Sequence, residues 1–397
     1  MKKTLLAAAL LAGFAGAASA QSSVTLYGLV DGGLRYNNVS YANGDGASNF
    51  GLAYGQQSGN RFGLRGVEDI GGGNKAMFVL ENGFDLGNGT IGQSGRLFGR
   101  QAWMGLDNNS WGYVRIGRQT NFATEYVGIP VDPFGTGFGQ LNMGTAFGIV
   151  NTDRISNTIK YQTPNMSGFQ AGIGYSFATG NTAFYTADAN GNNKTGTSGT
   201  GYNFATSNNT RQLTLGAKYA NGPIYVAASY DKLYADNGNT PNALTQLGRN
   251  ASISSWNIAG TYDFKVVKLA LGYGQTRDGA VLGQGTGVTG ASSITTKIGG
   301  SGDLIFAPSV GTNSYIVGLT VPVNPVSRVL LSWNMLTPNT NMQTAYNAQN
   351  QSAYNIAYTY DFTKRTNVYA LFGYMDNVGT VDTAKSTLIG LGLRHQF

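Results

Sequence analysis

Hydrophobic and polar positions alternate at the end of the sequence. One face of the last stretch holds Ile389, Leu391, Leu393, His395 and Phe397, and the other face holds the residues between them, which are smaller or more polar on the whole. Side chains point to opposite faces at successive residues of a strand. The pattern therefore predicts a strand with one mostly apolar side.

The same alternation recurs along the chain in segments of roughly ten residues, the length that a tilted strand needs to cross a bilayer. It predicts sixteen strands, at 23–36, 58–67, 75–83, 96–106, 111–119, 154–162, 168–178, 210–220, 223–234, 251–264, 266–276, 313–321, 327–336, 352–362, 366–376 and 386–397.

Short and long connections alternate between these segments. The short ones are rich in Gly, Asn, Asp and Pro, whereas long ones such as 177–209 and 275–312 are rich in Asn, Gly, Ser and Thr. This asymmetry is typical of an outer-membrane barrel with short periplasmic turns and long outer loops. The predicted fold is all-β: a sixteen-stranded antiparallel transmembrane β-barrel with both termini in the periplasm.

The first twenty residues have the features of a secretory signal peptide. Lys2 and Lys3 precede the apolar run 5–12, and the small residues 18–20 follow it. A spanning helix would need a longer apolar stretch. We expect cleavage before Gln21, so that residues 1–20 are the signal peptide and 21–397 the barrel.

Composition agrees with a barrel. The chain has no cysteine, 59 glycines and only 11% charged residues, with a formal net charge of +7. No segment after residue 20 has 18 consecutive apolar residues, which argues against a helical membrane protein. Without disulfides, an exported chain must be held by backbone pairing and packing, which a closed barrel provides.

Charged residues concentrate on the face that would line the lumen. The acids that alternation places inward are few: Asp31, Glu81 and Asp263. The inward bases are Arg35, Arg61, Arg65, Lys75, Arg96, Arg100, Arg115, Arg154, Lys160, Lys218, Lys268, Arg328 and Arg394. Any lumen position tolerates charge, but this tolerance does not explain the excess of one sign. The pattern indicates a basic lumen.

Several motifs, taken in order, carry a family resemblance. Residues 61–73 read RFGLRGVEDIGGG, 80–84 LENGF, 99–106 GRQAWMGL and 116–119 IGRQ. The opening VTLYG at 24–28, IKYQTP at 159–164 and the closing GLRHQF at 392–397 follow the same pattern. Together they resemble the general porins of the Gram-negative outer membrane, in the branch found in beta-proteobacteria.

The resemblance implies a homotrimer whose third outer loop folds into the lumen and narrows it to an eyelet. Here that loop is 120–153, with VDPFGTG at 131–137 as the matching constriction motif. The family's basic cluster falls on Arg61, Arg100 and Arg154 and its wall-side acid on Glu81, while Asp132 and Glu125 would supply acid from the loop. The remaining lumen lining would include Arg35, Arg65, Lys75, Arg96, Arg115 and Lys160. An alternative role for the eyelet arginines is structural, holding the inserted loop through ion pairs.

The resemblance also implies partners. Leu393, His395 and Phe397 match the C-terminal signal that the outer-membrane assembly machinery reads, and the second outer loop, about 82–95, would reach into a neighbouring subunit. The outer wall would contact membrane lipid and lipopolysaccharide.

Other chemistries lack the necessary residues. The one histidine, His395, lies on the outward face, so a Ser-His-Asp hydrolase has no usable base. Metal sites built on Cys or His are likewise not expected, nor is a cofactor, and a basic lumen does not favour nucleic-acid binding. The sequence favours a passive channel for small hydrophilic solutes and anions. The competing functions are a substrate-specific channel and an adhesin anchored by its barrel.

Overall fold

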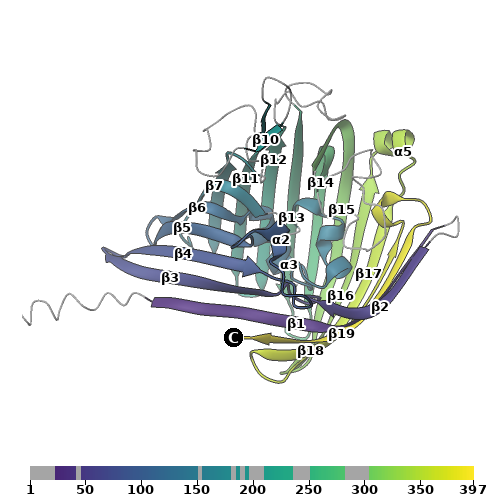
Figure 1. Cartoon of the computed structure of the whole chain (residues 1–397), viewed down its shortest axis with the longest axis horizontal. Coiled ribbons are helices and arrows are strands. Elements are labelled where there is room, and N and C mark those ends of the chain that lie inside the picture. The colour runs from purple at the N-terminus through teal and green to yellow at the C-terminus, as the bar shows by residue number, and fades with distance from the viewer. Residues whose placement is uncertain are drawn as a thin grey trace, which may run out of the picture.

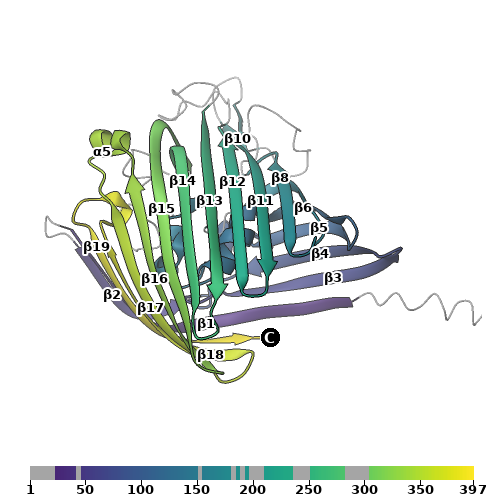
Figure 2. The same cartoon turned by 180° about the vertical axis from the view of Figure 1, so that it is seen from behind.

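The structure is a computed structural model and describes residues 23–41, 46–150, 154–179, 185–187, 193–195, 210–235, 251–281 and 304–397. The predicted signal peptide, 1–20, lies outside these residues. The described chain forms one closed antiparallel barrel (Figures 1 and 2). The first strand, β1 (Ser23–Ser40), pairs with the last, β19 (Lys385–Gln396), from Leu29 opposite Gln396 to Ser40 opposite Lys385, and this pairing closes the barrel.

The remaining strands follow one another around the barrel in sequence order. They are β2 (Gly46–Tyr54), β3 (Arg61–Gly71), β4 (Asn74–Gly83), β5 (Gln101–Asn108), β6 (Gly112–Thr120), β7 (Arg154–Gln162), β8 (Phe169–Ser176), β11 (Arg211–Asn221), β12 (Ile224–Tyr234), β13 (Ser252–Asp263), β14 (Lys268–Val281), β15 (Leu304–Asn324), β16 (Ser327–Pro338), β17 (Gln351–Asp361) and β18 (Thr366–Asp376). A separate short hairpin, β9 (Tyr185–Ala187) with β10 (Asn193–Thr195), belongs to the connection between β8 and β11.

The second barrel strand is interrupted. Both β2 and β3 pair with β1, β2 along 32–40 and β3 along 23–29, and residues 55–60 connect the two. Counted as one barrel strand, they give the sixteen that the alternation predicted. The prediction at 58–67 missed β2, whose Gly, Ser and Asn content reads as loop.

Strand β17 shows the predicted alternation of outward and inward side chains. In β17, the large side chains Tyr354, Ile356 and Tyr358 point outward and are 52%, 42% and 41% exposed, whereas Ala353 and Ala357 point inward and are buried. The lipid-facing belt is therefore apolar. Among the described helices, none has the length and apolar character required for a membrane span.

Apart from the second barrel strand, two predicted strand starts were wrong by five residues or more. β5 begins at Gln101 and not at 96, because the chain before it turns through left-handed backbone conformations at Gln93, Ser94 and Phe98. Alternation therefore cannot assign a face to Arg96 and Arg100, which precede the strand. β15 begins at Leu304 rather than 313, so it continues beyond the predicted membrane segment.

The third outer loop, between β6 and β7, lies inside the barrel as predicted (Figure 1). We call its described part, 121–150, loop 3. It contains the π-helix η1 (Ala123–Gly128), the short α3 (Ile129–Val131) and three 3₁₀ turns, η2 (Gly139–Leu141), η3 (Met143–Thr145) and η4 (Gly148–Val150). Three further short helices lie in outer loops: α2 (Gly92–Gly95), α5 (Thr340–Tyr346) and η6 (Val378–Thr380).

Loop 3 is held by apolar packing against the inner wall. Its residues Phe122, Tyr126 and Phe147 form one buried cluster with wall residues of β12 to β16. A second cluster joins Phe138 and Leu141 to β16, β17, β18 and β19. Burying aromatic side chains of this size contributes on the order of 2 kcal/mol each. Part of the barrel interior is thus a packed core rather than open lumen.

Candidate functional site

The polar contacts of loop 3 trace its path along the wall. Tyr225 Oη on β12 donates to the carbonyl of Tyr126 at 2.6 Å, and Lys268 Nζ on β14 donates to the carbonyl of Pro130 at 3.3 Å. Further along, Asn334 Nδ2 on β16 contacts the Leu141 carbonyl at 3.3 Å. The loop therefore covers the wall from β11 toward β19.

The tip of loop 3 reaches the interruption between β2 and β3. A Cβ at Gly137 would lie 2.0 Å from the carbonyl oxygen of Gln57, so only glycine fits this close approach. The interruption itself is pinned by Asp31, a buried acid whose carboxylate accepts from the Tyr369 hydroxyl and from the Ser58 backbone N–H at 2.5 and 2.6 Å. The wall from β3 to β6, together with the first residues of β7, is the part that these loop contacts leave uncovered.

The uncovered wall carries the predicted arginines. We call Arg61, Arg100, Arg154 and Glu81 the wall cluster. Arg100 Nε donates to Glu81 Oε1 at 2.7 Å, and Arg61 Nη1 lies 4.0 Å from the same oxygen. Glu81 is the buried member, with 6% of its side chain exposed against 24% for Arg61.

The second oxygen of Glu81 is also bound. Tyr27 Oη donates to Glu81 Oε2 at 3.1 Å. Arg154 lies within electrostatic range of Arg61, Arg100 and Glu81. The structure therefore brings together all four residues that the sequence grouped, three cations around one carboxylate.

Sequence reasoning missed Arg118, which braces this cluster. Its Nε donates to the Gly99 carbonyl at 2.7 Å, and its Nη1 donates to the Arg154 carbonyl at 3.0 Å and to Ser156 Oγ at 2.8 Å. It thus ties together the segments that carry Arg100 and Arg154. The sequence did contain a signal for Arg118, because strict alternation places this arginine on the lipid-facing side of its strand. A charge is costly there unless it bonds polar backbone groups at the end of a strand.

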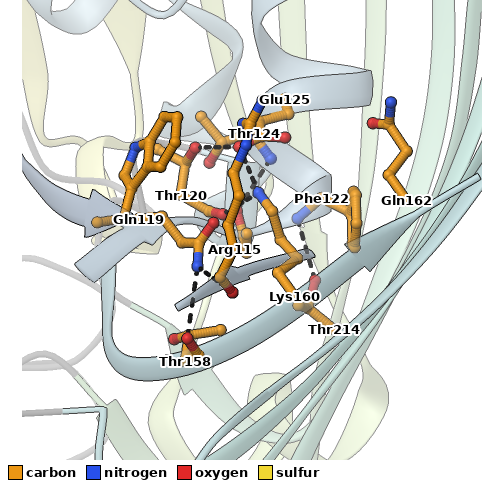
Figure 3. Close-up of polar contacts among 12 residues, drawn as sticks. Arg115, Gln119, Thr120, Phe122, Thr124, Glu125, Thr158, Lys160, Gln162 and Thr214 are labelled. Atoms are coloured by element: carbon orange, nitrogen blue, oxygen red, sulfur yellow. Dashed lines mark hydrogen bonds and ion pairs between the residues drawn. The ribbon is translucent and has the colours of Figure 1, made fainter. Parts of the chain in front are cut away.

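A second set of charges lies where loop 3 leaves β6 (Figure 3). We call Arg115, Lys160, Lys218 and Glu125 the root cluster. Lys160 is fully buried, and its Nζ donates to Glu125 Oε1 at 2.5 Å and to the Thr120 carbonyl at 3.0 Å. Glu125 Oε1 also accepts from Thr120 Oγ1 at 2.7 Å. Glu125 therefore fastens the first turn of loop 3 to β7.

Cations and aromatic rings alternate around this root. Lys160 Nζ lies 4.8 Å from the Phe122 ring centroid, and Lys218 Nζ lies 4.5 Å from that of Tyr126. Tyr126 Oη donates to Gln162 Oε1 at 2.5 Å. Such contacts stabilise by about 0.5–2 kcal/mol each, depending on exposure.

Asp132, the other loop acid, is buried rather than turned toward the lumen. Its carboxylate accepts from the backbone N–H groups of Phe134 and Met143 at 3.0 and 2.8 Å, and 5% of the residue is exposed. Burial raises the pKa of Asp132 to about 6, against the lowering effect of these hydrogen bonds. Asp132 closes the fold of loop 3 across eleven residues.

The exposed edge of loop 3 is consequently almost uncharged. Glu125 and Asp132 are the two charged residues in 121–150. The first is bound to Lys160 and the second is buried, whereas Ile129 is 52% exposed and Gly135 and Gly139 are exposed. The wall cluster thus has no free carboxylate from the described part of loop 3 to balance it.

The other predicted lumen residues lie apart from the two clusters. Arg65 stacks on the Tyr27 ring at 5.6 Å, Arg35 is partly exposed on β1, and Lys75 stands opposite Asp69 and Asp107 in the strand register. Arg394 donates to Asn367 and Ser58, Arg328 lies 3.7 Å from Asp361, and Asp263 lies 3.7 Å from Lys265. Arg96 lies in the connection before β5, outside the strands.

The three predicted assembly residues lie on the outward face of β19 or directly after it. Leu393 and Phe397 are 50% and 48% exposed, and His395 Nδ1 is 2.9 Å from Thr366 Oγ1. Backbone hydrogen bonds in both directions join Phe397 to Gly28. Within the described residues, no group of three His, Cys, Asp or Glu side chains could hold a metal ion.

Known proteins match both the sequence and this geometry. The family model of the Gram-negative porins matches residues 7–380. The chain belongs to this family. An outer membrane porin protein of Bordetella pertussis is 47% identical over 407 residues, covering 100% of both chains, and outer membrane porin protein 32 of Delftia acidovorans is 31% identical over 419 residues, again covering 100% of both.

A solved porin has the same architecture. The anion-selective porin from Comamonas acidovorans superposes with a TM-score of 0.66 at 25% identity, over 95% of this chain and 100% of that one. This porin is therefore a barrel of the cell outer membrane, and it forms a water-filled channel through which small hydrophilic solutes and ions diffuse passively. The family indicates a channel rather than an enzyme.

Proposed function

We propose that this porin prefers anions and that the wall cluster is its constriction. The observation that carries the proposal is the uneven charge across the passage. Arg61, Arg100 and Arg154 share one carboxylate, Glu81, while the two acids in the described part of loop 3 are bound to Lys160 or buried. The similarity to a porin described as anion-selective supports the same preference.

Arginine is well suited to line an anion-selective constriction. A guanidinium stays charged at any working pH and presents several donors in a fixed plane. A ring of arginine in a narrow, low-dielectric passage raises the local concentration of anions and disfavours cations. Glu81 orients Arg100 through its hydrogen bond and leaves a net positive charge on the wall.

The two loop acids receive a different role from the one the family pattern suggested. We assign Glu125 and Asp132 to holding loop 3, because the first is tied to Lys160 and the second accepts loop backbone N–H groups. The alternative in which eyelet arginines hold the loop is less favoured, since Arg61 and Arg100 pair with Glu81 on the wall.

Reversal potential tests the proposed constriction. Replacing Arg61, Arg100 and Arg154 together with serine should abolish most of the anion preference in a tenfold potassium chloride gradient across a planar bilayer. Arg35→Ser, a lumen arginine outside the wall cluster, is the control and should change the potential far less, since charge beyond a Debye length of about 8 Å is screened. An unchanged reversal potential in the triple variant would overturn the proposal.

Assembly as a homotrimer is part of the same proposal. The connection between β4 and β5 exposes Leu86, Ile91 and Leu97, the last to 60%, as an apolar surface beside the barrel wall. We expect it to pack on a neighbouring subunit, and the rest of the outer wall to contact lipid and lipopolysaccharide. Native mass spectrometry in mild detergent should give the trimer, and monomers alone would contradict it.

Export and insertion complete the proposal. The mature chain should begin at Gln21, which mass spectrometry of outer-membrane protein would show. Deleting Phe397 should sharply lower the amount of assembled protein without changing synthesis, because the assembly machinery would lose the outward terminal aromatic and the barrel would lose two backbone hydrogen bonds to Gly28. Conversely, wild-type levels of the truncated protein in the outer membrane would exclude the signal role.

A further inference from the structure

The guanidinium of Arg115 lies between two aromatic rings of the lumen wall. Its Cζ is 4.3 Å from the Trp103 ring centroid and 3.8 Å from that of Tyr113. Gly105 stands opposite Arg115 in the β5–β6 register, and a Cβ there would lie 2.9 Å from Arg115 Cγ. Because Gly105 has no side chain, the side chain of Arg115 has space to lie against this part of the sheet.

Both rings are fixed in place. Trp103 Nε1 donates to Gln101 Oε1 at 2.7 Å, and Tyr113 Oη donates to Gln162 Oε1 at 3.3 Å. Trp103 and Tyr113 are only 7% and 6% exposed. A guanidinium held between such rings loses little conformational entropy when a ligand binds, which favours binding.

Arg115 nevertheless has free donors. Across the described ranges, its guanidinium makes no hydrogen bond or ion pair, although the residue is partly exposed. Two carboxylates lie in its surroundings. Glu125 is bound by Lys160 and Thr120, and Asp107 stands opposite Tyr113 rather than Arg115 in the strand register.

A second cation, Lys218, is linked to this position through Tyr126. Lys218 on β11 stacks on Tyr126, and Tyr126 in turn lies within electrostatic range of Arg115 and Tyr113. Arg115 is five residues from the end of β6 at Thr120, roughly 16 Å along the strand toward the periplasmic turn. Since Arg154 of the wall cluster pairs with Thr120, the backbone of Arg115 is well separated from that cluster, whereas its side chain belongs to the root cluster.

We propose that Arg115, assisted by the charge of Lys218 across Tyr126, is a second anion-binding position of the lumen and that it binds small carboxylates. This inference rests on the proposed anion channel, which delivers the ligand. The planar fork of a guanidinium donates two parallel hydrogen bonds to a carboxylate, whereas spherical chloride cannot use both in the same way. Carboxylates should therefore pause at Arg115 while chloride passes.

Conductance saturation tests the site. Single-channel conductance is measured against concentration in sodium acetate and in sodium chloride. Wild-type conductance should saturate in acetate at a concentration where chloride conductance is still rising. Arg115→Lys keeps the charge but loses the fork and the stacking, and should raise the half-saturating acetate concentration roughly fivefold. Arg65→Lys, a lumen arginine on a single ring, is the matched control and should leave it unchanged.

The outcomes separate this site from the proposed constriction. Arg115→Lys should leave the reversal potential in a potassium chloride gradient unchanged, since no charge is removed. The carboxylate site would be overturned if the wild type and Arg115→Lys saturated at the same acetate concentration. It would also be overturned if the wild type saturated at the same concentration in acetate and in chloride. Trp103→Leu, which removes one ring and no charge, should also weaken saturation, and a wild-type result there would count against the proposed clamp. A wild-type channel without anion preference would instead refute the constriction proposal.

Discussion

The wall cluster and the root cluster contain the same charges, three cations and one glutamate, but they are built in opposite ways. In the wall cluster the carboxylate is buried, with 6% of the Glu81 side chain exposed, and the arginines around it are more exposed. In the root cluster the cation is buried, since the Lys160 side chain has no exposed surface, while Glu125 is 24% exposed.

The inversion separates structure from function. A buried carboxylate aligns arginines and leaves their charge facing the passage. A buried lysine consumes the charge of its partner in holding two segments of chain together, here β7 and the start of loop 3. The cation that binds each glutamate follows this difference: Arg100 binds Glu81 and Lys160 binds Glu125, because arginine presents a planar fork to solutes and lysine a compact ammonium that fits a closed site.

The largest effect we expect comes from breaking the buried pair of the root cluster. Lys160→Met removes the ammonium and leaves Glu125 and the Thr120 carbonyl without their partner, a loss of about 3 kcal/mol for a buried pair. Loop 3 should then detach at its start. Faster hydrogen exchange in peptides covering 121–150 and a noisier open channel would report it.

A double variant provides the control for that experiment. Lys160→Met combined with Glu125→Gln removes both charges, so part of the lost protection should return. Protection that is unchanged in Lys160→Met alone would mean that apolar packing, and not the root cluster, holds loop 3.

The next effect concerns pH and the other loop acid. The pKa of Asp132 is raised from 3.8 to about 6, so the folded loop binds a proton more tightly than the detached loop does. The resulting stability is fully present below pH 3.8 and is lost as pH rises through 6, a difference of order 3 kcal/mol. Loop 3 should exchange hydrogen more slowly at pH 4.5 than at 7.5 after correction for intrinsic rates.

Asp132→Asn tests whether this acid is the cause. The amide does not titrate, so the variant should lose most of the pH dependence of exchange in 121–150. A variant with the pH dependence of wild type would assign the effect to other groups. The wall cluster should not respond over this range, since its function depends on arginine charge.

Much of this architecture follows from the sequence because the bilayer enforces alternation. The two-residue period alone was enough to predict strands β17 and β19 and the pairing of β19 with β1 that closes the barrel. The grouping of Arg61, Arg100, Arg154 and Glu81 came from family spacing, since Arg100 lies outside a strand, where alternation has no force.

What the sequence did not reveal depends on irregular backbone. β2 and its interruption, the left-handed turn at Phe98 and the bracing by Arg118 arise where strand pairing stops and side chains bind backbone carbonyls. The burial of Asp132 could not be predicted from the sequence either. A loop motif shows that an acid is present, but only the folded loop shows that Phe134 and Met143 enclose it.

Neutralising Glu81 of the wall cluster should have a smaller effect than the two changes above. It should alter ion selectivity and leave the stability of loop 3 unchanged. Glu81→Gln removes one negative charge beside three arginines. At roughly 7 Å in water a unit charge contributes about 0.6 kcal/mol, or roughly threefold in local anion concentration. The reversal potential in a chloride gradient should shift further toward anions, with exchange in 121–150 unchanged. A shift toward cations would show that Glu81 acts mainly by positioning Arg100.

The smallest change in selectivity is expected from the equivalent substitution at the root. Glu125→Gln alters the net charge by the same amount as Glu81→Gln, but its carboxylate is already bound by Lys160 Nζ and Thr120 Oγ1. Ions in the passage therefore experience little of that charge, while loop 3 loses its tie to β7. We expect the reversal potential to stay near wild type and exchange in 121–150 to rise. If both glutamines shift the reversal potential equally, the two clusters act on ions alike, and the division between a constriction and an anchor is wrong.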